Sequence, residues 1–149
     1  MYGFINKILG VLLCFAMIII MLSTVMVTDY LQATRSVVAE VTNFVDEVTD
    51  TGVLTPAQLS DLYTACVSYG VQADVQVLRY VKVINPDPLD ADNVIRNYVV
   101  NEDIYNWKQG DLVKVNVNAI GQTGLTSFLY HIFGLNIANL NFTLAGRIR

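Results

Sequence analysis

The sequence predicts an α+β protein in which a long N-terminal helix leaves a membrane and carries a small head. The head is expected to contain a second helix and an antiparallel sheet of three or four strands. Three observations predict this class. An uncharged, apolar run occupies residues 8–28, and apolar residues at helical spacing continue beyond it to residue 48. Much of the remaining chain alternates between apolar and polar residues, which is the period of a β-strand.

The composition argues against catalysis and nucleic-acid binding. Hydrophobic residues make up 54% of the 149 residues and charged residues 15%, against about 25% charged in a typical soluble domain. The net charge of −4 disfavours a nucleic-acid partner, which needs a basic patch. A single histidine, His131, leaves few ways to build a metal or acid–base site. We therefore expect no enzyme and no catalytic, cofactor-binding or metal-binding residues.

The run between Lys7 and Asp29 fits a membrane-spanning helix. Its 21 residues, at about 1.5 Å of rise each, cover a hydrocarbon core of about 30 Å. A secretory signal peptide has a shorter apolar region, followed by a small-x-small cleavage site that this run does not have. The basic residue before the run and the acidic residue after it favour a cytoplasmic N-terminus and an extracellular head in a single-pass protein of the cell membrane.

The helix is expected to continue out of the membrane without a break. No glycine or proline occurs between Gly10 and Gly52, and the apolar residues that recur at helical spacing are Tyr30, Ala33, Val37, Val41, Phe44, Val45 and Val48. We predict one helix over residues 4–48, with Gly52 just beyond its end. The chain then divides into a leader and membrane segment (1–28), an extracellular continuation of the helix (29–52) and an α+β head (53–149).

A second helix is signalled by Thr55-Pro56-Ala57-Gln58, a capping box with proline at the first helical position. Gly70 is expected to end it. The apolar stripe expected to face the core consists of Ala57, Leu59, Leu62, Tyr63, Cys66 and Val67. Since Cys66 lies on this stripe, a small buried residue is expected there rather than a reactive thiol.

Strands are predicted in most of the remainder. Alternation over residues 71–77 begins a strand that continues to Ile84 and stops at Asn85-Pro86-Asp87-Pro88. A polar loop is expected through Asn93, and residues 94–100 fit either a short strand or a helical turn. The turn Gln109-Gly110-Asp111 leads into a strand over 112–118, which ends at the glycines of 121–124. A short apolar helix over 126–133 and a last strand over 140–149 complete the head.

Two segments leave alternatives open. The acidic stretch from Asp87 to Asp92 offers the oxygen ligands that calcium prefers, but aspartate, asparagine and proline also form ordinary turns. The apolar segment from Leu125 to Leu135 can pack in the core of the head, or it can face lipid or a partner subunit.

The layout resembles the type IV pilin-like proteins, and within them the TadE-like pseudopilins of Tad/Flp pilus systems and their short Gram-positive relatives. The likeness rests on the helix end at Val48-Thr49-Asp50-Thr51-Gly52, on the turn and valine-rich strand over 109–115, and on the last strand over 140–149 with Ala145-Gly146-Arg147. The resemblance implies a pilin-like head and a structural protein of a surface filament or secretion system.

The leader departs from the family pattern. Prepilins are cut after a glycine and usually carry glutamate at the fifth mature position. The candidate junctions here are Gly3-Phe4 and Gly10-Val11, whose fifth positions are Ile8 and Phe15. Cleavage after Gly3, cleavage after Gly10 and no cleavage all remain open.

The sequence thus favours a pilin-like subunit that assembles through its N-terminal hydrophobic helix. Its partners would be the membrane, other pilin-like subunits and, indirectly, an assembly platform protein and a secretion ATPase. Close helix contacts are expected at the small residues Gly10, Ala16, Ser23, Thr24 and Ala33. The alternative is a single-pass, membrane-anchored extracellular binding module that does not polymerise.

Overall fold

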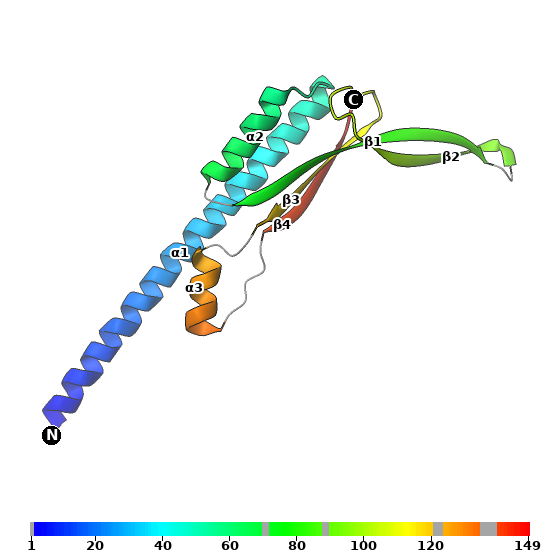
Figure 1. The fold of residues 1–149 in the computed structure, drawn as a ribbon. Helices are drawn as coiled ribbons and strands as arrows, with labels where there is room; N and C mark the ends of the chain where they lie inside the picture. Colours follow the sequence, from blue (N-terminus) through cyan, green and yellow to red (C-terminus); the bar gives the residue numbers. More distant parts are fainter. Residues whose placement is uncertain (1, 70–71, 88–89, 121–123, 135–139) are drawn as a thin grey trace.

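A computed structural model describes residues 2–69, 72–87, 90–120, 124–134 and 140–149. Its dominant element is helix α1, which runs unbroken over the 50 residues Tyr2–Thr51 (Figure 1). The predicted continuous helix is confirmed and extends slightly further at both ends. Gly52 ends it as expected: its φ is +63°, and its N–H donates to the Val48 carbonyl at 2.9 Å.

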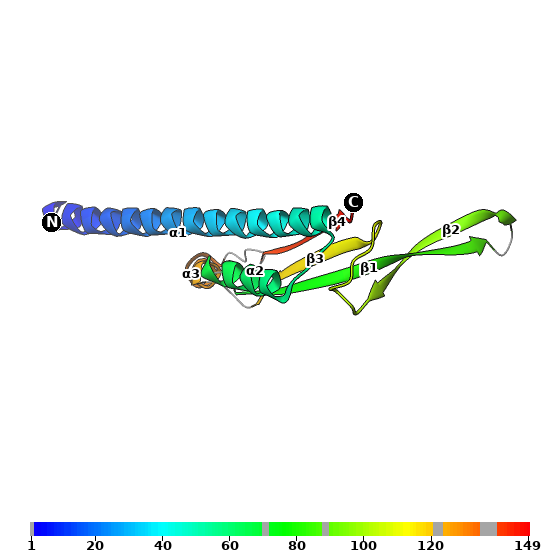
Figure 2. The same ribbon diagram turned by 90° about the horizontal axis from the view of Figure 1, so that it is seen from above.

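The two halves of α1 have different surroundings. The N-terminal part of α1, beyond α3, projects away from the rest of the chain, whereas the C-terminal half lies along the sheet and α2 (Figures 1 and 2). The buried side chains of α1 begin only at Val37 and recur at helical spacing; they are Val37, Val41, Phe44, Val45, Val48 and Thr49. The outward continuation of α1 is therefore the part that packs against the head.

Helix α2, Pro56–Ser68, runs back beside the end of α1 (Figure 1). The predicted capping box is present: the Gln58 N–H donates to Thr55 Oγ1 at 3.2 Å, and the Thr55 N–H donates to Gln58 Oε1 at 2.8 Å. The expected end at Gly70 lies outside the described residues.

The apolar stripe of α2 is narrower than the sequence predicted. Leu62 and Cys66 are buried and Leu59 packs partly against the core, but Val67 is 64% exposed. Tyr63 is also exposed, although its hydroxyl donates to the Val75 carbonyl at 2.6 Å. Ala57 is exposed as well. Because α2 lies at the outside of the head, only a strip along one side of it meets α1 and the sheet.

The sheet has four antiparallel strands in the order β2-β1-β3-β4. The strands are β1 (Ala73–Asp87), β2 (Asp90–Asn101), β3 (Leu112–Ala119) and β4 (Asn141–Arg147). The α+β class and the number of strands agree with the sequence. The turn before β3 is also confirmed, with Gly110 at φ +93°.

Two boundaries of the first hairpin were predicted wrongly. Strand β1 continues through Asn85, Pro86 and Asp87, and β2 begins at Asp90 inside the expected polar loop. The ambiguous segment 94–100 is a strand. A proline is tolerated here because β1 pairs with β3 only as far as Tyr80, so beyond that residue one of its edges faces no other strand of the described chain.

Beyond Tyr80, the two strands form a ribbon that extends past the end of α1 (Figure 2). We call this ribbon, residues 81–87 and 90–99, the β-arm. It pairs only with itself, and its exposed large apolar side chains are Ile84, Ile95, Tyr98 and Val99.

The core lies between one face of the sheet and the C-terminal half of α1. Val113, Val115 and Val117 of β3 are fully buried, while Lys114 and Asn116 lie on the opposite, more solvent-exposed face of the sheet. Strand β4 comes especially close to α1 at Gly146, where a Cβ atom would overlap the side chains of Thr49 and Val45. Helix α3, Gly124–Phe133, contacts α1 further toward its N-terminus (Figure 1).

Candidate functional site

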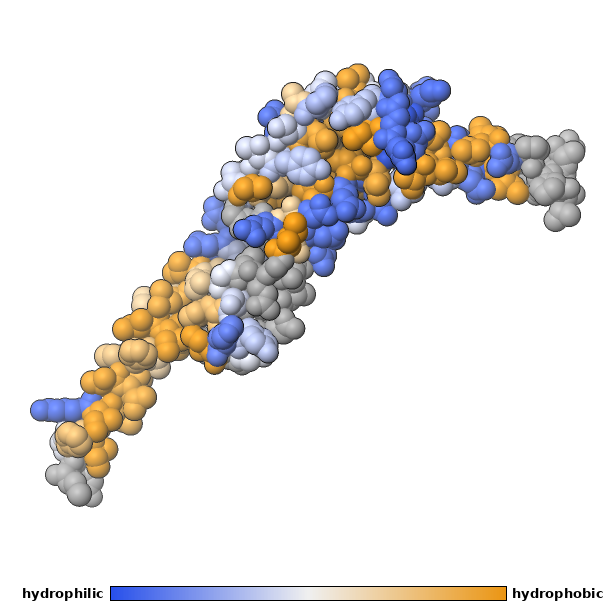
Figure 3. All heavy atoms as spheres, in the orientation of Figure 1, coloured by the Kyte–Doolittle hydropathy of each residue, from blue (hydrophilic) through white to orange (hydrophobic). Residues whose placement is uncertain are grey.

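The surface of α1 over residues 4–31 is the largest apolar feature of the described chain. We call it the apolar helix surface. Its most apolar 18-residue stretch has a mean hydropathy of 2.8, and none of that stretch is buried within the protein. Figure 3 shows apolar residues along this half of the helix and polar ones gathered on the head. Its exposed large apolar residues are Phe4, Ile5, Ile8, Leu9, Val11, Leu12, Leu13, Phe15, Met17, Ile18, Ile20, Met21, Leu22, Val25, Val27 and Leu31.

The helix is long and apolar enough to cross a membrane once. The hydroxyl groups of residues 8–28 are satisfied within the helix: those of Ser23, Thr24 and Thr28 donate to the carbonyls four residues earlier at 2.8, 2.8 and 2.9 Å. Hydrocarbon offers no partner for a free hydroxyl, so these internal bonds fit a lipid environment.

The five small residues at which close helix contacts were predicted do not form one stripe along α1; they are Gly10, Ala16, Ser23, Thr24 and Ala33. Ser23 and Thr24 line a shallow groove of about 330 Å³ together with Ile20, Val27 and Thr28. Ala33 packs partly against the core of the head. Gly10 and Ala16 lie at least one turn away from the groove, toward the N-terminus. The groove therefore contains two of the five.

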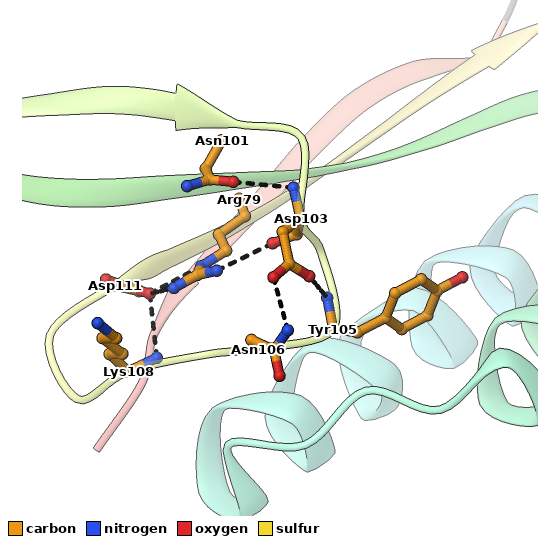
Figure 4. A network of polar contacts seen from close by, with 7 residues as sticks. All are labelled: Arg79, Asn101, Asp103, Tyr105, Asn106, Lys108 and Asp111. Atoms are coloured by element: carbon orange, nitrogen blue, oxygen red, sulfur yellow. Dashed lines mark hydrogen bonds and ion pairs between the residues drawn. The ribbon is translucent and has the colours of Figure 1, made fainter.

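A second site lies at the base of the β-arm (Figure 4). Arg79 of β1 is buried, and its Nε and Nη2 atoms lie 2.8 and 2.7 Å from Asp111 Oδ2. Its Nη1 donates to the Asp103 carbonyl at 3.0 Å, and its guanidinium lies 5.7 Å from the ring centroid of Trp107. The Lys108 N–H also donates to Asp111 Oδ2, at 3.0 Å. The network ties β1 to the loop between β2 and β3.

Asp103 organises the same loop (Figure 4). Its carboxylate accepts from the Asn106 side chain at 2.6 Å and from the Tyr105 N–H at 3.1 Å, and its own N–H donates to the Asn101 side chain at 2.8 Å. The hydrogen bond from Asn106 is the main reason that the pKa of Asp103 lies below its usual value, and the Tyr105 N–H adds to it. These contacts hold the arm base in a fixed shape.

Sequence reasoning missed this network, although one signal was available. Arg79 occupies a core-facing position in the alternation that begins with Val75 and Val77. A charged residue at such a position needs a buried partner, but the sequence alone does not say that this partner is Asp111. The network has the geometry of a structural anchor, since its charges are bonded to one another and to the backbone of the loop.

Within the acidic stretch from Asp87 to Asp92, Asp87 pairs with Asp90 at the end of the described β-arm, and residues 88–89 lie outside the described residues. The calcium alternative therefore stays untested. Within the ranges that the structure covers, no group of three or more histidine, cysteine, aspartate or glutamate residues is placed to hold a metal ion.

The two cysteines and the histidine lie apart from one another. Cys14 is exposed on the apolar helix surface, and Cys66 is buried in the head, where burial raises the pKa of its thiol. The thiol of Cys66 is therefore a packed group with low reactivity, as the sequence predicted. His131 is exposed on α3, with Nδ1 2.8 Å from the Ser127 carbonyl oxygen.

The apolar segment 125–135 contains most of α3, and Leu135 lies outside the described residues. Ser127 and Phe128 are half-buried, whereas Tyr130 and Ile132 are 52% and 47% exposed. These described side chains of α3 do not belong to the buried core.

Searches against protein-family models, curated proteins and solved structures find no match to this chain.

Proposed function

We propose that this protein is a structural, pilin-like subunit of a surface filament or of a secretion or conjugation apparatus. The subunit resides in the cell membrane as a single-pass protein, with a cytoplasmic N-terminus and an extracellular head. It assembles through its N-terminal helix with copies of itself or with other pilin-like subunits. An assembly platform protein and a secretion ATPase would act on it indirectly.

The observation that carries this proposal is the apolar helix surface at the free end of an unbroken helix. Sixteen large apolar side chains between Phe4 and Leu31 are at least 37% exposed. At about 1 kcal/mol for each half-exposed side chain, leaving them in water costs on the order of 10–20 kcal/mol. That cost is comparable with the entire stability of a small domain, about 5–15 kcal/mol. Lipid, or the helices of neighbouring subunits, must therefore cover this surface.

The shape of the helix supports assembly as well as membrane anchorage. Apolar side chains are exposed on all sides of α1 over residues 4–18, so one helix can contact several neighbours at once. Apart from α3, the head rests along the C-terminal half of α1 (Figure 2), and residues 4–18 are left accessible. Subunits bundled through the apolar half would carry their heads on the outside of a filament.

The test is a kink placed between these two halves. Gln32 is exposed and precedes Val37, the first residue of α1 that is buried against the head. Proline at position 32 removes the N–H that bonds to the preceding turn and costs about 3 kcal/mol or more. We expect Gln32→Pro to stay in the membrane with a protease-resistant head but to disappear from sheared surface filaments, whereas Gln32→Ala assembles normally. A wild-type protein that never enters a sheared surface fraction would contradict the proposal.

A non-polymerising, membrane-anchored binding module is the second candidate, and the β-arm favours it. The arm carries Ile84, Tyr98 and Val99 into solvent beyond the end of α1 (Figure 2), where a binding partner can reach them. A binding module would remain in the membrane fraction under shear and would tolerate Gln32→Pro, because its head folds beyond the kink.

A further inference from the structure

Within the head, helix α3 contacts α1 and lies beside its membrane-compatible part. From Gly3 to Asp29, every side chain of α1 is exposed except three that are half-buried: Ile19, Ser23 and Met26. Together with the half-buried Tyr30, these residues are spaced by four, three and four, so they form one stripe along the helix. Helix α3 contacts α1 and lies next to this part of it (Figure 1), which places α3 at the level of the stripe.

The stripe defines the depth of α3 in a bilayer. If residues 8–28 occupy the hydrocarbon core, Ile19 lies near its middle and Thr28 at its outer boundary. Nine residues at about 1.5 Å of rise correspond to about 14 Å, close to half of a core of about 30 Å. Helix α3 therefore lies at the level of the outer leaflet.

The chemistry of α3 fits that position. Its ten residues, Gly124–Phe133, include no charged side chain. At about 15 Å, α3 is too short to span a bilayer but long enough to lie within one leaflet. Tyr130 and Ile132 are about half exposed, and neither belongs to the core of the head. Tyrosine is enriched at membrane–water boundaries, where its ring lies in an apolar region and its hydroxyl in a wet one.

The polar groups of α3 do not oppose this placement. His131, its one titratable side chain besides Tyr130, has Nδ1 2.8 Å from the Ser127 carbonyl oxygen. The ring of Tyr130 packs edge-on against that of His131, with centroids 5.7 Å apart. One ring nitrogen of His131 thus has a partner within α3, and the two rings pack against each other.

We infer that α3 is a membrane-embedded helix, which inserts into the outer leaflet beside α1 and whose exposed side chains contact lipid acyl chains. This inference rests on the proposed membrane span of α1. Lipid is the occupant that the geometry favours, because the uncovered side chains of α3 continue the apolar helix surface at the same depth. The head would then be held to the membrane at two points, and α3 would have to leave the lipid together with α1 during assembly.

The experiment measures the depth of single labelled positions in the full chain, reconstituted into phosphatidylcholine vesicles. The background variant is Cys14→Ala, which removes the exposed cysteine; Cys66 is 1% exposed and stays unlabelled. An environment-sensitive fluorophore is attached at Ile132→Cys on α3. The vesicles contain lipids with a nitroxide either high or low on the acyl chain.

Two control positions of similar exposure make the result decisive. Ile84→Cys, 59% exposed in the β-arm, reports a position far from the membrane, and Ile18→Cys, 55% exposed on α1, reports the middle of the span. We expect the label at Ile132 to be blue-shifted and quenched most strongly by the shallow nitroxide. The label at Ile18 should be quenched most strongly by the deep nitroxide, and that at Ile84 by neither.

The outcomes separate the two proposals. Quenching at Ile18 with a water-like label at Ile132 would overturn the insertion of α3 and leave the membrane span intact. A blue-shifted label at Ile132 without nitroxide quenching would also overturn it, because a second copy of the chain would then be covering α3. Absence of quenching at Ile18 would refute the membrane span itself and the insertion of α3 with it.

Discussion

Removal of the Asp111 carboxylate tests whether the buried ion pair anchors the β-arm. In Asp111→Ala, Oδ2 no longer accepts from Arg79 Nε at 2.8 Å, from Arg79 Nη2 at 2.7 Å or from the Lys108 N–H at 3.0 Å. Arg79 is only 4% exposed, so water cannot replace the lost partner without a rearrangement. Breaking a buried pair by removing one member costs about 3–5 kcal/mol.

That loss is large on the scale of the head. A domain of this size has a free energy of unfolding of about 5–15 kcal/mol, so Asp111→Ala should lose a third or more of it. The assay is urea unfolding of the full chain in detergent micelles, followed by fluorescence of Trp107, whose ring lies 5.7 Å from the Arg79 guanidinium. The midpoint should fall sharply, and protease should cut the loop between β2 and β3 faster than in the wild type.

A double variant shows whether the loss of stability comes from the buried charge of Arg79 that is left without a partner. Replacing both members of a buried pair by apolar residues of similar size is often neutral or stabilising. We therefore expect Arg79→Met combined with Asp111→Leu to recover most of the stability that Asp111→Ala loses. If Asp111→Ala unfolds within about 1 kcal/mol of the wild type, which is the range of an exposed pair, the inference of a buried anchor is wrong.

Two further predictions concern the packing and the pH response of the head. Gly146→Ala places a Cβ against Thr49 and Val45 of α1, so overpacking should lower the free energy of unfolding in urea by about 1–3 kcal/mol. The control Ala145→Ser, at an exposed position of the same strand, should be nearly neutral. Equal stability of the two variants would contradict the close approach of β4 to α1. Hydrogen bonds to its carboxylate hold the folded-state pKa of Asp103 below 3.8, so its contribution to the stability of the fold is present above pH 3.8 and is lost as the pH falls through the folded-state pKa. An NMR titration of the Tyr105 amide should follow the protonation of Asp103. If the same titration is unchanged in Asp103→Asn, the step does not belong to Asp103.

Several features follow from short-range patterns in the sequence. The continuity of α1 was predictable because no glycine or proline interrupts residues 11–51 and apolar residues keep a helical period. The end at Gly52 and the capping box at Thr55 depend on groups within four residues of each other. The buried face of β3 follows from strict alternation over Leu112–Ala119. The apolar helix surface, the main part of the candidate site, is a property of composition and was likewise predicted.

Other features required the tertiary structure, because they depend on residues far apart in the chain. Asp111, the partner of Arg79, lies 32 residues away from it, and no local pattern selects that partner. The β-arm runs through Pro86 because β3 ends its pairing at Tyr80, which the local turn signals do not reveal. Likewise, the apolar pattern of α3 fits the core, lipid or a partner equally well; only the tertiary structure shows that α3 contacts α1 and that Tyr130 and Ile132 stay exposed, because both depend on how distant segments of the chain pack together.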